Sequence, residues 1–553
     1  MIKKITTLVF AWTFCLIGAV AIAQPVSHDW AVDMGGQSTS NDYLALTNDA
    51  QGNTYIVGDF EGSKSFGPFT LMATGTKEVF VAMYNSAGVC QWALKGGANF
   101  STASAGGITY SGGFVYATGH FINNINFGTG NISSSGNFND IFVVKIDPAT
   151  GTAQWVNKYG GPVIDEGYTI CEDGSGGVFI AGKFSGTANF GSQTLNSGNF
   201  NNLDIYLARL NSSGICSWAV KAGHVSKEDI PYDIALSPTG DVAVTGSFHS
   251  PAAFGSTTAT GNPSAQDFFL ANYNASNGNL KWISTGGSAG GDWGTGIGFD
   301  PSNNYYISGF IGDTATFGNI TVNSDANGNI FIGKFNSSGV PQWIKSNGSN
   351  SNDSGLDIVT DFGGSSYVTG YVTATANFDG TILTGIQLRD AFVCKYSTSG
   401  TLRWVSRIGG PGIDTGKSLA LNSNGKVTVA GEFFGNVNVD GTVISAPFNE
   451  RAVFLTRMGG GTVGLNEDKA NSLSIYPNPA KDVVTIILPD MNDAMVTLEI
   501  IDIQGKIVSS QPLKNITGQK NTTIDISNIA PGSYYLTLDT SNGFYRSRLV
   551  VAE

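Results

Sequence analysis

The sequence predicts an all-β fold built from one unit that repeats seven times, and three recurring features support this prediction. Tryptophan recurs at intervals of 61–64 residues. An aromatic residue that opens a short strand pattern follows the same period, and so does a Phe-Gly pair. Because three residue types share one spacing, we interpret them as the frame of a structural repeat. The frame tryptophans are Trp30, Trp92, Trp155, Trp218, Trp282, Trp343 and Trp404.

Each repeat contains four strand patterns, which are short β-branched or aromatic runs bounded by Gly, Asn, Asp and Ser. In one repeat they are Ile234–Leu236, Val242–Thr245, Phe268–Tyr273 and Lys281–Ser284. After the N-terminal segment no stretch keeps a 3.6-residue periodicity, so we expect almost no helix. Four antiparallel strands in each unit are typical of a propeller blade, and seven units predict a seven-bladed β-propeller.

The two ends of the repeat array predict how the propeller closes. The first frame element is the strand around Trp30, whereas the last is the aromatic strand from Val453 to Met458, which no tryptophan strand follows. We therefore expect the Trp30 strand to complete the blade that ends at Met458. Such closure would remove the open sheet edges that favour aggregation. The frame tryptophans are expected to pack between blades.

Residues 1–23 have the features of an export signal. Two lysines precede an apolar core from Ile5 to Val20, and the small residues Ala21-Ile22-Ala23 predict cleavage before Gln24. No later apolar run reaches the ~20 residues that span a bilayer, so we expect no transmembrane segment. The mature chain is therefore expected to be exported and soluble.

Composition limits the classes of partner. Removal of the two lysines of the export signal changes the formal net charge from −13 to −15, and only 13% of the residues are charged. A mildly acidic surface without clustered Lys and Arg argues against nucleic acid and anionic membranes as partners. The four cysteines of the mature chain follow no disulfide pattern, so we expect buried thiols.

Short motifs recur around the strands of residues 24–460. Examples are Gly160-Gly161, Gly182-Lys183-Phe184, Asp140-Ile141-Phe142, Asp414-Thr415-Gly416 and the Asp-x-x-Gly-Asn-x-Tyr stretch that starts at Asp49. With these motifs and the tryptophan strands, the segment resembles the bacterial β-propeller repeat family often labelled SBBP. The resemblance implies a propeller and is nearly silent on activity, because one fold hosts many functions.

The repeat period ends in a glycine-rich segment, and we expect residues 461–471 to be a linker. Short strand patterns then alternate with turns, which predicts a small β-sandwich over residues 472–553. Three motifs stand out in this segment, and they are Tyr476-Pro477-Asn478-Pro479, the pair Gly532 and Tyr534, and a basic, apolar end that starts at Arg548.

With these motifs the segment closely resembles the C-terminal (Por) sorting domain of type IX secretion. The resemblance implies recognition by the type IX secretion machinery and passage across the outer membrane. It also implies removal of the domain, with the remainder released or attached at the cell surface. An accessory sandwich without a sorting role is the alternative.

Strand alternation divides the expected propeller into two faces. Tight hairpin turns, such as Asn211–Gly214 and Ser237–Gly240, fall on one face, and the longer connections fall on the other. Because binding residues usually lie on loops held by a rigid scaffold, we look for a site on the long-loop face. One acidic residue recurs there, just before the strand expected to line the axis. One repeat lacks this acid, and Ser104 takes its place in the sequence pattern. The acidic set comprises Asp42, Asp165, Asp229, Asp292, Asp353 and Asp414.

Two interpretations of the acidic set are open. The set could form a ring that binds a cation or a polyol, or each carboxylate could accept backbone N–H groups of its own loop. No Asp-x-Asp-x-Asp loop of calcium-binding type occurs, and the histidines follow no metal-ligand spacing. We therefore expect no metal and no other cofactor.

The second candidate set, called the variable set here, is the middle residue of the Gly-x-Phe motif. Its frame hardly changes, whereas the middle residue differs in every repeat, so specificity could lie here; exposed filler is the alternative. Trp293, which follows Asp292, is the one tryptophan of the mature chain outside the frame. It could stack on a sugar or anchor a protein, or it could pack in the channel mouth. The variable set comprises Asp59, His120, Lys183, Ser247, Phe310, Tyr371 and Glu432.

No catalytic motif is recognisable, because no nucleophile elbow or phosphate loop occurs in the required context. We therefore expect a monomeric, exported propeller that binds glycan or protein outside the cell without catalysis. Two alternatives are kept. One is polysaccharide cleavage by a carboxylate pair on the long-loop face, and the other is a structural role in a surface layer or matrix.

Overall fold

The computed structural model describes residues 28–38, 43–198, 200, 202–324, 327–439, 441–446, 451–458, 471–488, 495–502, 507–514, 521–540 and 543–552. Within these residues the fold is all-β without a helix, which confirms the predicted class. None of the described segments forms an apolar helix long enough to span a membrane. The export signal over residues 1–23 and the candidate Asp42 lie outside the described residues.

Within the described residues, seven sheets each contain a row of four antiparallel strands, in the order that the repeat predicts. The first strands are β2 (Leu44–Asn48), β8 (Thr102–Ser111), β14 (Asp165–Glu172), β20 (Ile230–Leu236), β26 (Asp292–Phe299), β32 (Ser354–Thr360) and β38 (Thr415–Leu421). The second strands are β3 (Thr54–Phe60), β9 (Phe114–Ile122), β15 (Val178–Phe184), β21 (Asp241–His249), β27 (Tyr305–Ile311), β33 (Ser366–Val372) and β39 (Val427–Phe434).

The two outer strands of each row follow the same order. The third strands are β6 (Glu78–Tyr84), β12 (Asp140–Ile146), β18 (Asp204–Leu210), β24 (Gln266–Asn274), β30 (Asn329–Phe335), β36 (Asp390–Tyr396) and β42 (Arg451–Met458). The fourth strands are β7 (Cys90–Gly96), β13 (Ala153–Tyr159), β19 (Cys216–Gly223), β25 (Leu280–Gly287), β31 (Pro341–Asn347), β37 (Leu402–Ile408) and β1 (His28–Ser38).

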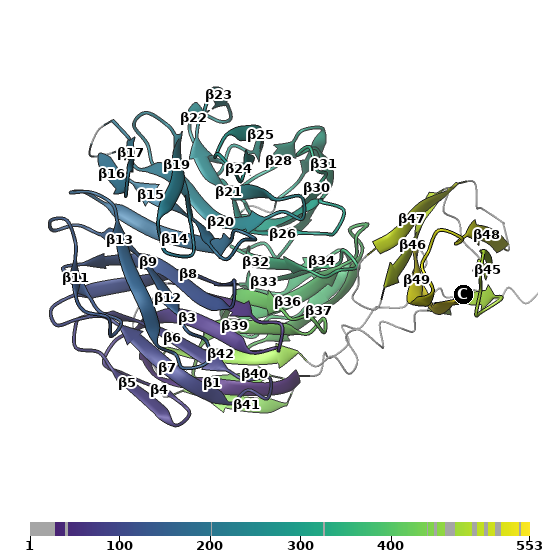
Figure 1. Cartoon of the computed structure of the whole chain (residues 1–553), viewed down its shortest axis with the longest axis horizontal. Coiled ribbons are helices and arrows are strands. Elements are labelled where there is room, and N and C mark those ends of the chain that lie inside the picture. Colours follow the sequence, from purple (N-terminus) through teal and green to yellow (C-terminus); the bar gives the residue numbers. More distant parts are fainter. Residues whose placement is uncertain are drawn as a thin grey trace, which may run out of the picture.

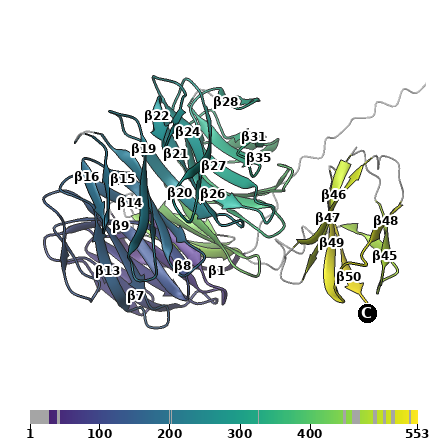
Figure 2. The same ribbon diagram turned by 45° about the horizontal axis from the view of Figure 1, so that its top comes forward.

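The first strands of successive rows lie against one another. They contact in the order β2, β8, β14, β20, β26, β32 and β38, and β38 in turn contacts β2. Figure 1 shows the light green β42 returning beside the purple β1 at the start of the chain. Figure 2, which is turned by 45°, shows β14, β20 and β26 next to one another. The molecule is therefore propeller-like, with the first strands innermost.

The last row contains the first strand of the chain. β1 pairs with β42 in antiparallel register from His28 opposite Met458 to Ser38 opposite Arg451. The side chain of Arg457 is almost fully buried and lies over the Trp30 ring. This is the pairing that the two ends of the repeat array predict.

Each long connection between second and third strands folds into a small hairpin, which the sequence analysis did not foresee. Several of these hairpins pair with the fourth strand of the preceding row, so they link neighbouring sheets. The hairpins are β4–β5 (Ser63–Phe66, Phe69–Met72), β10–β11 (Asn124–Ile125, Ile132–Ser133), β16–β17 (Thr187–Phe190, Gln193–Asn196), β22–β23 (Ala252–Phe254, Thr257–Ala259), β28–β29 (Ala315–Phe317, Ile320–Val322), β34–β35 (Ala376–Phe378, Thr381–Leu383) and β40–β41 (Asn436–Val439, Thr442–Ser445).

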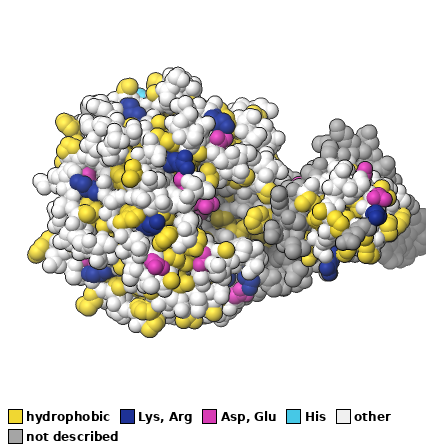
Figure 3. All heavy atoms as spheres, viewed as in Figure 1, with side chains coloured by type: hydrophobic (Ala, Val, Ile, Leu, Met, Phe, Trp, Pro, Cys, Tyr) yellow, Lys and Arg dark blue, Asp and Glu magenta, His cyan; other side chains and the backbone are white. Residues whose placement is uncertain are grey.

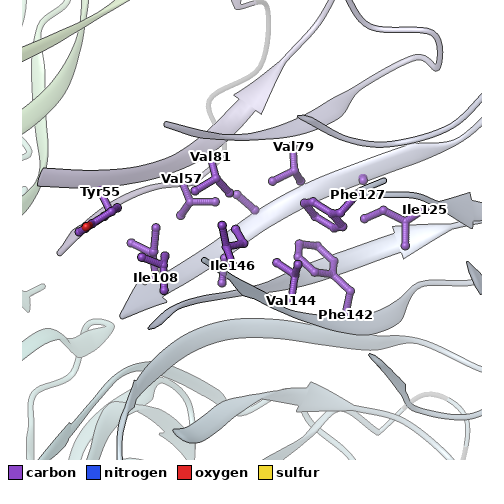
Figure 4. Packing of buried hydrophobic residues seen from close by; sticks show 14 of the residues in the cluster. Tyr55, Val57, Val79, Val81, Ile108, Ile125, Phe127, Phe142, Val144 and Ile146 are labelled. Carbon is purple, nitrogen blue, oxygen red and sulfur yellow. The ribbon is translucent and has the colours of Figure 1, made fainter. Parts of the chain in front are cut away.

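Apolar side chains fill the space between neighbouring sheets. Figure 4 shows one such cluster, in which Val57 and Val81 from one sheet face Ile108 and Val144 from the next. Frame tryptophans pack in the same spaces, and several of their indole N–H groups donate to carbonyls of the following repeat, whereas the buried indole N–H of Trp404 has no hydrogen-bond partner among the residues that the structure describes. Examples are Trp92 to Pro148 (2.9 Å), Trp218 to Ala275 (3.0 Å) and Trp343 to Thr398 (3.0 Å). Where it is present, a carbonyl at a fixed place in the next turn favours tryptophan at this position of the repeat.

The C-terminal strands form two further sheets, in the orders β43-β50-β49-β46-β47 and β44-β45-β48. Apolar residues from both sheets share one core, among them Ile486 from one and Leu536 from the other, as the predicted sandwich requires. The strands are β43 (Asn471–Ser472), β44 (Ser474–Tyr476), β45 (Val483–Ile487), β46 (Met495–Asp502), β47 (Ile507–Lys514), β48 (Asn521–Asp525), β49 (Gly532–Thr540) and β50 (Gly543–Val551).

Candidate functional site

The described members of the acidic set are fully buried and bonded to their own loops. Each accepts a backbone N–H group from a residue four or five positions earlier, for example Gly161 to Asp165 (2.6 Å) and His224 to Asp229 (2.6 Å). Backbone N–H groups likewise reach Asp292, Asp353 and Asp414. This is the arrangement that the loop-shaping interpretation describes. Among the described residues no group of three or more His, Cys, Asp or Glu could hold a metal ion.

One slot of the acidic set needs a correction. Ser104 does not occupy the position of the missing acid, because Ala103 pairs with Phe121 as Asp165 pairs with Phe184. Ser104 instead lies opposite His120. The sequence alone could not place the residue, since this loop lacks the aspartate that marks the register elsewhere.

Burial disfavours the charged form of these carboxylates. It raises the pKa of Asp165 to about 8 and the pKa values of Asp229 and Asp414 to about 7. For Asp292 burial raises the pKa to about 6, and for Asp353 it raises the pKa above the ordinary value. The native state therefore holds protons at these sites at pH values where the unfolded chain has released them.

This difference predicts a pH dependence for the free energy of unfolding. Between the ordinary pKa of 3.8 and about 8, native Asp165 binds a proton that unfolded Asp165 does not. Its contribution to stability is thus present at low pH and is lost as the pH rises through about 8. We expect Asp165→Asn to remove this loss. The free energy of unfolding of the variant, measured by urea titration relative to that of the unmodified chain, should therefore rise between pH 4 and pH 8.

Asp173 provides the matched control. Burial acts to raise its pKa, but hydrogen bonds from Ser175 and Arg209 outweigh burial and lower it. Because Asp173 is ionised in both states above about pH 5, the stability difference for Asp173→Asn should stay constant from pH 5 to pH 8. A constant difference for Asp165→Asn over the same range would contradict the prediction.

The variable set lies beside the residues that directly follow the acidic slot. Strand register pairs six of its seven members, all except Asp59, with one such residue across the first and second strands. The pairs are Ser104 with His120, Glu166 with Lys183, Ile230 with Ser247, Trp293 with Phe310, Ser354 with Tyr371, and Thr415 with Glu432. We call these twelve residues the axial rosette, because they lie at one end of the innermost strands.

Charged members of the rosette form a connected group. The Lys183 ammonium lies 2.6 Å from Glu228 and 3.3 Å from Glu166. Although burial acts to raise the pKa of Glu166, His120 and Lys183 outweigh it, so the pKa lies below its ordinary value. In the first repeat, two rows away, Asp59 of the variable set pairs with Lys77 at 3.4 Å. These side chains bring both signs of charge together at the axial end, where Asp59 and Lys77 are buried.

Aromatic members occupy another part of the rosette. Trp293 stacks on Phe310 with ring centroids 4.4 Å apart. The Arg389 guanidinium lies 3.7 Å from the centroid of the Tyr371 ring, and the Tyr371 hydroxyl donates to Asn352 (2.7 Å). Trp293 therefore has a packing partner while it keeps partial exposure.

Two carboxylates near the axis were missed by the sequence analysis. Asp233 accepts from the Thr169 hydroxyl (3.0 Å) and from the Ile297 N–H (3.0 Å), which belong to the first strands on either side. Asp357 accepts from Leu419 in the same manner (2.7 Å). A second acid four residues after Asp229 or Asp353 was the signal that could have found them. Both carboxylates bond neighbouring first strands together.

The motifs of the C-terminal segment meet in space. The Asn478 side chain donates to the Arg548 carbonyl (2.7 Å) and accepts from the Val550 N–H (2.8 Å), so the turn is held against β50. Tyr534 lies two residues after Gly532, the first residue of β49, and its hydroxyl donates to the Ala530 carbonyl (2.7 Å). Tyr476 and the Arg548 side chain remain exposed, while Pro477 and Pro479 flank Asn478.

Comparison with known families decides the nature of this segment. Residues 474–552 match the family of the secretion system C-terminal sorting domain. The sorting domain implies interaction with the type IX secretion machinery and points to secretion to the cell surface or the extracellular space. A comparison with curated proteins gives no match.

Solved structures resemble the chain at low identity. A chain of a mitotic checkpoint complex is 11% identical, with a TM-score of 0.41 over 82% of this chain and 99% of that chain. A gluconolactonase from Xanthomonas campestris is 9% identical, with a TM-score of 0.33 over 79% and 99%. A PQQ-bound aldose sugar dehydrogenase from Streptomyces coelicolor is 11% identical, with a TM-score of 0.31 over 78% and 99%.

Proposed function

We propose that the chain is an exported binding protein whose closed, seven-bladed propeller holds a glycan or a protein outside the cell without catalysis. In this proposal residues 1–23 are a signal peptide, residues 24–460 are a monomeric propeller of SBBP type, residues 461–471 are a linker, and residues 472–553 direct export. The seven four-strand rows and the contact of β38 with β2 support closure. The match of residues 474–552 to a sorting domain supports export.

The observation that carries the binding role is the axial rosette. Its backbone frame recurs in register from repeat to repeat, but its side chains change from an ion pair at Glu166 and Lys183 to stacked rings at Trp293 and Phe310. A constant scaffold that presents different side chains at one end is suited to recognition. Aromatic rings beside polar and charged groups are typical of surfaces that bind sugars or proteins.

The charge distribution supports the same class of partner. Figure 3 shows Lys and Arg scattered among Asp and Glu over one face of the molecule. The acidic set favours binding over carboxylate cleavage, because each described member is buried and bonded to its own loop. A glycan or a protein therefore fits this surface better than a nucleic acid does.

A glycan array and a protein pull-down with the purified chain test the proposal. We expect a ligand whose affinity falls at least about tenfold in Trp293→Ser or Tyr371→Ser, because each change removes an aromatic contact. Ser338→Ala, in a hairpin turn away from the rosette, is the control and should leave binding unchanged. Product release from a bound polysaccharide, or binding that ignores both aromatic changes, would overturn the proposal.

A further inference from the structure

One turn departs from the repeat. Between β8 and β9 only Gly112 and Gly113 turn the chain, whereas residues 173–177 separate β14 from β15. Both glycines have positive φ, 57° and 84°, as a two-residue hairpin turn requires. The short turn ends the strand at Ser111 and has no aspartate of its own.

In three other repeats the longer turn begins with an aspartate that pairs with a cation of the third strand. The distances are 2.9 Å for Arg209 to Asp173, 3.4 Å for Lys334 to Asp300, and 3.6 Å for Lys395 to Asp361. Each cation lies opposite a frame tryptophan in the strand register. The cation and the aspartate therefore form a recurring neutral unit.

Lys145 is the cation of the repeat with the short turn, and it lies opposite Trp155. In the described part of the chain no carboxylate lies within ion-pair distance of its ammonium. The ammonium instead donates to the Ser212 carbonyl (3.0 Å) and lies 3.9 Å from the centroid of the Phe114 ring. The missing aspartate thus leaves a positive charge without an acidic partner.

A cavity opens beside the short turn, with Ser111 and Gly112 in its lining. It has a volume of about 470 Å³, and its lining includes Phe114, Lys145, Glu172 and Ser175. An adjoining cavity of about 370 Å³ shares Phe114 and Lys145 and adds Trp155. Volumes of this order are common for pockets that hold small ligands.

The Trp155 ring is also turned relative to the frame. The turn glycine of the next repeat shows where each ring lies. A Cβ atom at Gly151 would come 2.6 Å from Cδ2 of Trp92, so the centre of the Trp92 ring system lies under that turn. At the matching Gly214 the nearest Trp155 atom is Cη2, at 3.0 Å. The indole N–H of Trp155 donates to Ser212 over a longer distance, 3.4 Å. The indole therefore lines the cavity edge.

We propose that these adjoining cavities bind a sugar ring that carries a carboxylate, a uronic acid residue. The Lys145 ammonium supplies the positive charge for the carboxylate. Phe114 and Trp155 offer apolar ring faces against which the C–H face of a sugar packs. Glu172 and Ser175 are exposed and accept hydrogen bonds from sugar hydroxyls. The site lies at the short-turn face, whereas the axial rosette lies at the other end of the strands.

Isothermal titration of the full chain with digalacturonate tests the proposal, with the neutral disaccharide of galactose and with acetate as comparison ligands. We expect digalacturonate to bind at least about tenfold more tightly than either, because only it offers both ring and charge. Lys145→Gln should weaken digalacturonate at least about tenfold, and Lys145→Arg should keep most of the affinity. If the galacturonate monomer binds as tightly as digalacturonate, the site holds a single sugar unit. If digalacturonate binds more tightly than the monomer, the ligand is a polysaccharide.

Lys281→Gln is the matched control. Its ammonium pairs with Asp241 in another repeat, so the change removes the same charge without touching the cavity. Its affinity for digalacturonate should stay within about twofold of the unmodified chain. Phe114→Leu keeps the charge and should reduce the preference for digalacturonate over acetate, which tests the site even if Lys145→Gln is poorly folded.

Two results would overturn the proposal. One is an absence of digalacturonate binding, and the other is binding that Lys145→Gln and Phe114→Leu leave unchanged. Trp293→Ser separates this site from the axial rosette, because digalacturonate affinity should not change in that variant. If this variant loses the rosette ligand but still binds digalacturonate, the two sites are independent. The proposal for one site can then fail without affecting the proposal for the other.

Discussion

Removal of residues 25–36 is expected to abolish cooperative folding of the repeat array or to lower its unfolding temperature by at least about 10 °C. The deletion takes away most of β1 (His28–Ser38), which pairs with β42 along its length. The row β38-β39-β42 would then end in an exposed edge, and unpaired edges favour aggregation. Calorimetry and size-exclusion chromatography of the purified chain measure both effects.

The expected cost is large because β1 carries several buried contacts. Met34 is fully buried. The Arg457 guanidinium lies 5.1 Å from the Trp30 ring centroid, and the Thr456 hydroxyl donates to the Trp30 carbonyl (2.9 Å). Loss of one large core side chain typically costs roughly 3–5 kcal/mol, and the deletion removes a whole strand.

Addition of the missing strand provides the control. A synthetic peptide of residues 25–38 should restore cooperative unfolding to the deleted chain, because β42 still offers its free backbone groups. A peptide of the same composition in scrambled order should not. If the deleted chain unfolded cooperatively at an unchanged temperature without any peptide, the closing role of β1 would be refuted.

A chain that ends at residue 471 is expected to stay inside the cell envelope. The sorting domain over residues 474–552 points to secretion to the cell surface or the extracellular space, so its removal should eliminate the exported fraction. All strands of the repeat array, from β1 to β42, remain in the truncated chain. It should therefore keep the unfolding temperature of the repeat array. Immunoblots of medium, surface and periplasmic fractions measure the first effect, and calorimetry measures the second.

Transfer of the segment gives the reciprocal test. A folded carrier protein fused to residues 472–553 should reach the surface or the medium, whereas the same carrier fused to residues 28–458 should not. Asn478→Ala should weaken export of the fusion, because the Asn478 amide holds its turn against β50 through two hydrogen bonds. Export of the truncated chain at the normal level would show that another signal suffices.

The sequence predicted the large-scale order of the fold because each repeat must bury the same faces. The tryptophan period marks positions such as Trp92 and Trp218, whose indoles reach a carbonyl of the next repeat. The pairing of the Trp30 strand with the strand ending at Met458 followed from the two ends of the array. The hairpins between second and third strands were missed, because their strands are only two to four residues long and carry little periodicity.

The candidate site was only partly accessible from sequence. The variable set was found by its variation within a constant frame, and strand register placed six of its seven members beside the residue after the acidic slot. The role of Asp233 was not visible, because its partners Thr169 and Ile297 lie about 64 residues away on neighbouring first strands. The Gly112-Gly113 pair is visible in the sequence. Its consequence became clear only from the structure, in which Lys145 lacks the aspartate that pairs with the matching cation in three other repeats.

The sequence by itself determined the repeat, the strand order within each repeat and the presence of a sorting domain at the C-terminal end. These follow from local patterns, because burial and turn chemistry act on residues that are close in the chain. Only the tertiary structure decided which side chains of different repeats meet, from the rosette to the cavity beside Lys145. Such contacts depend on how neighbouring sheets pack, and a change of one turn by three residues alters them without altering the repeat.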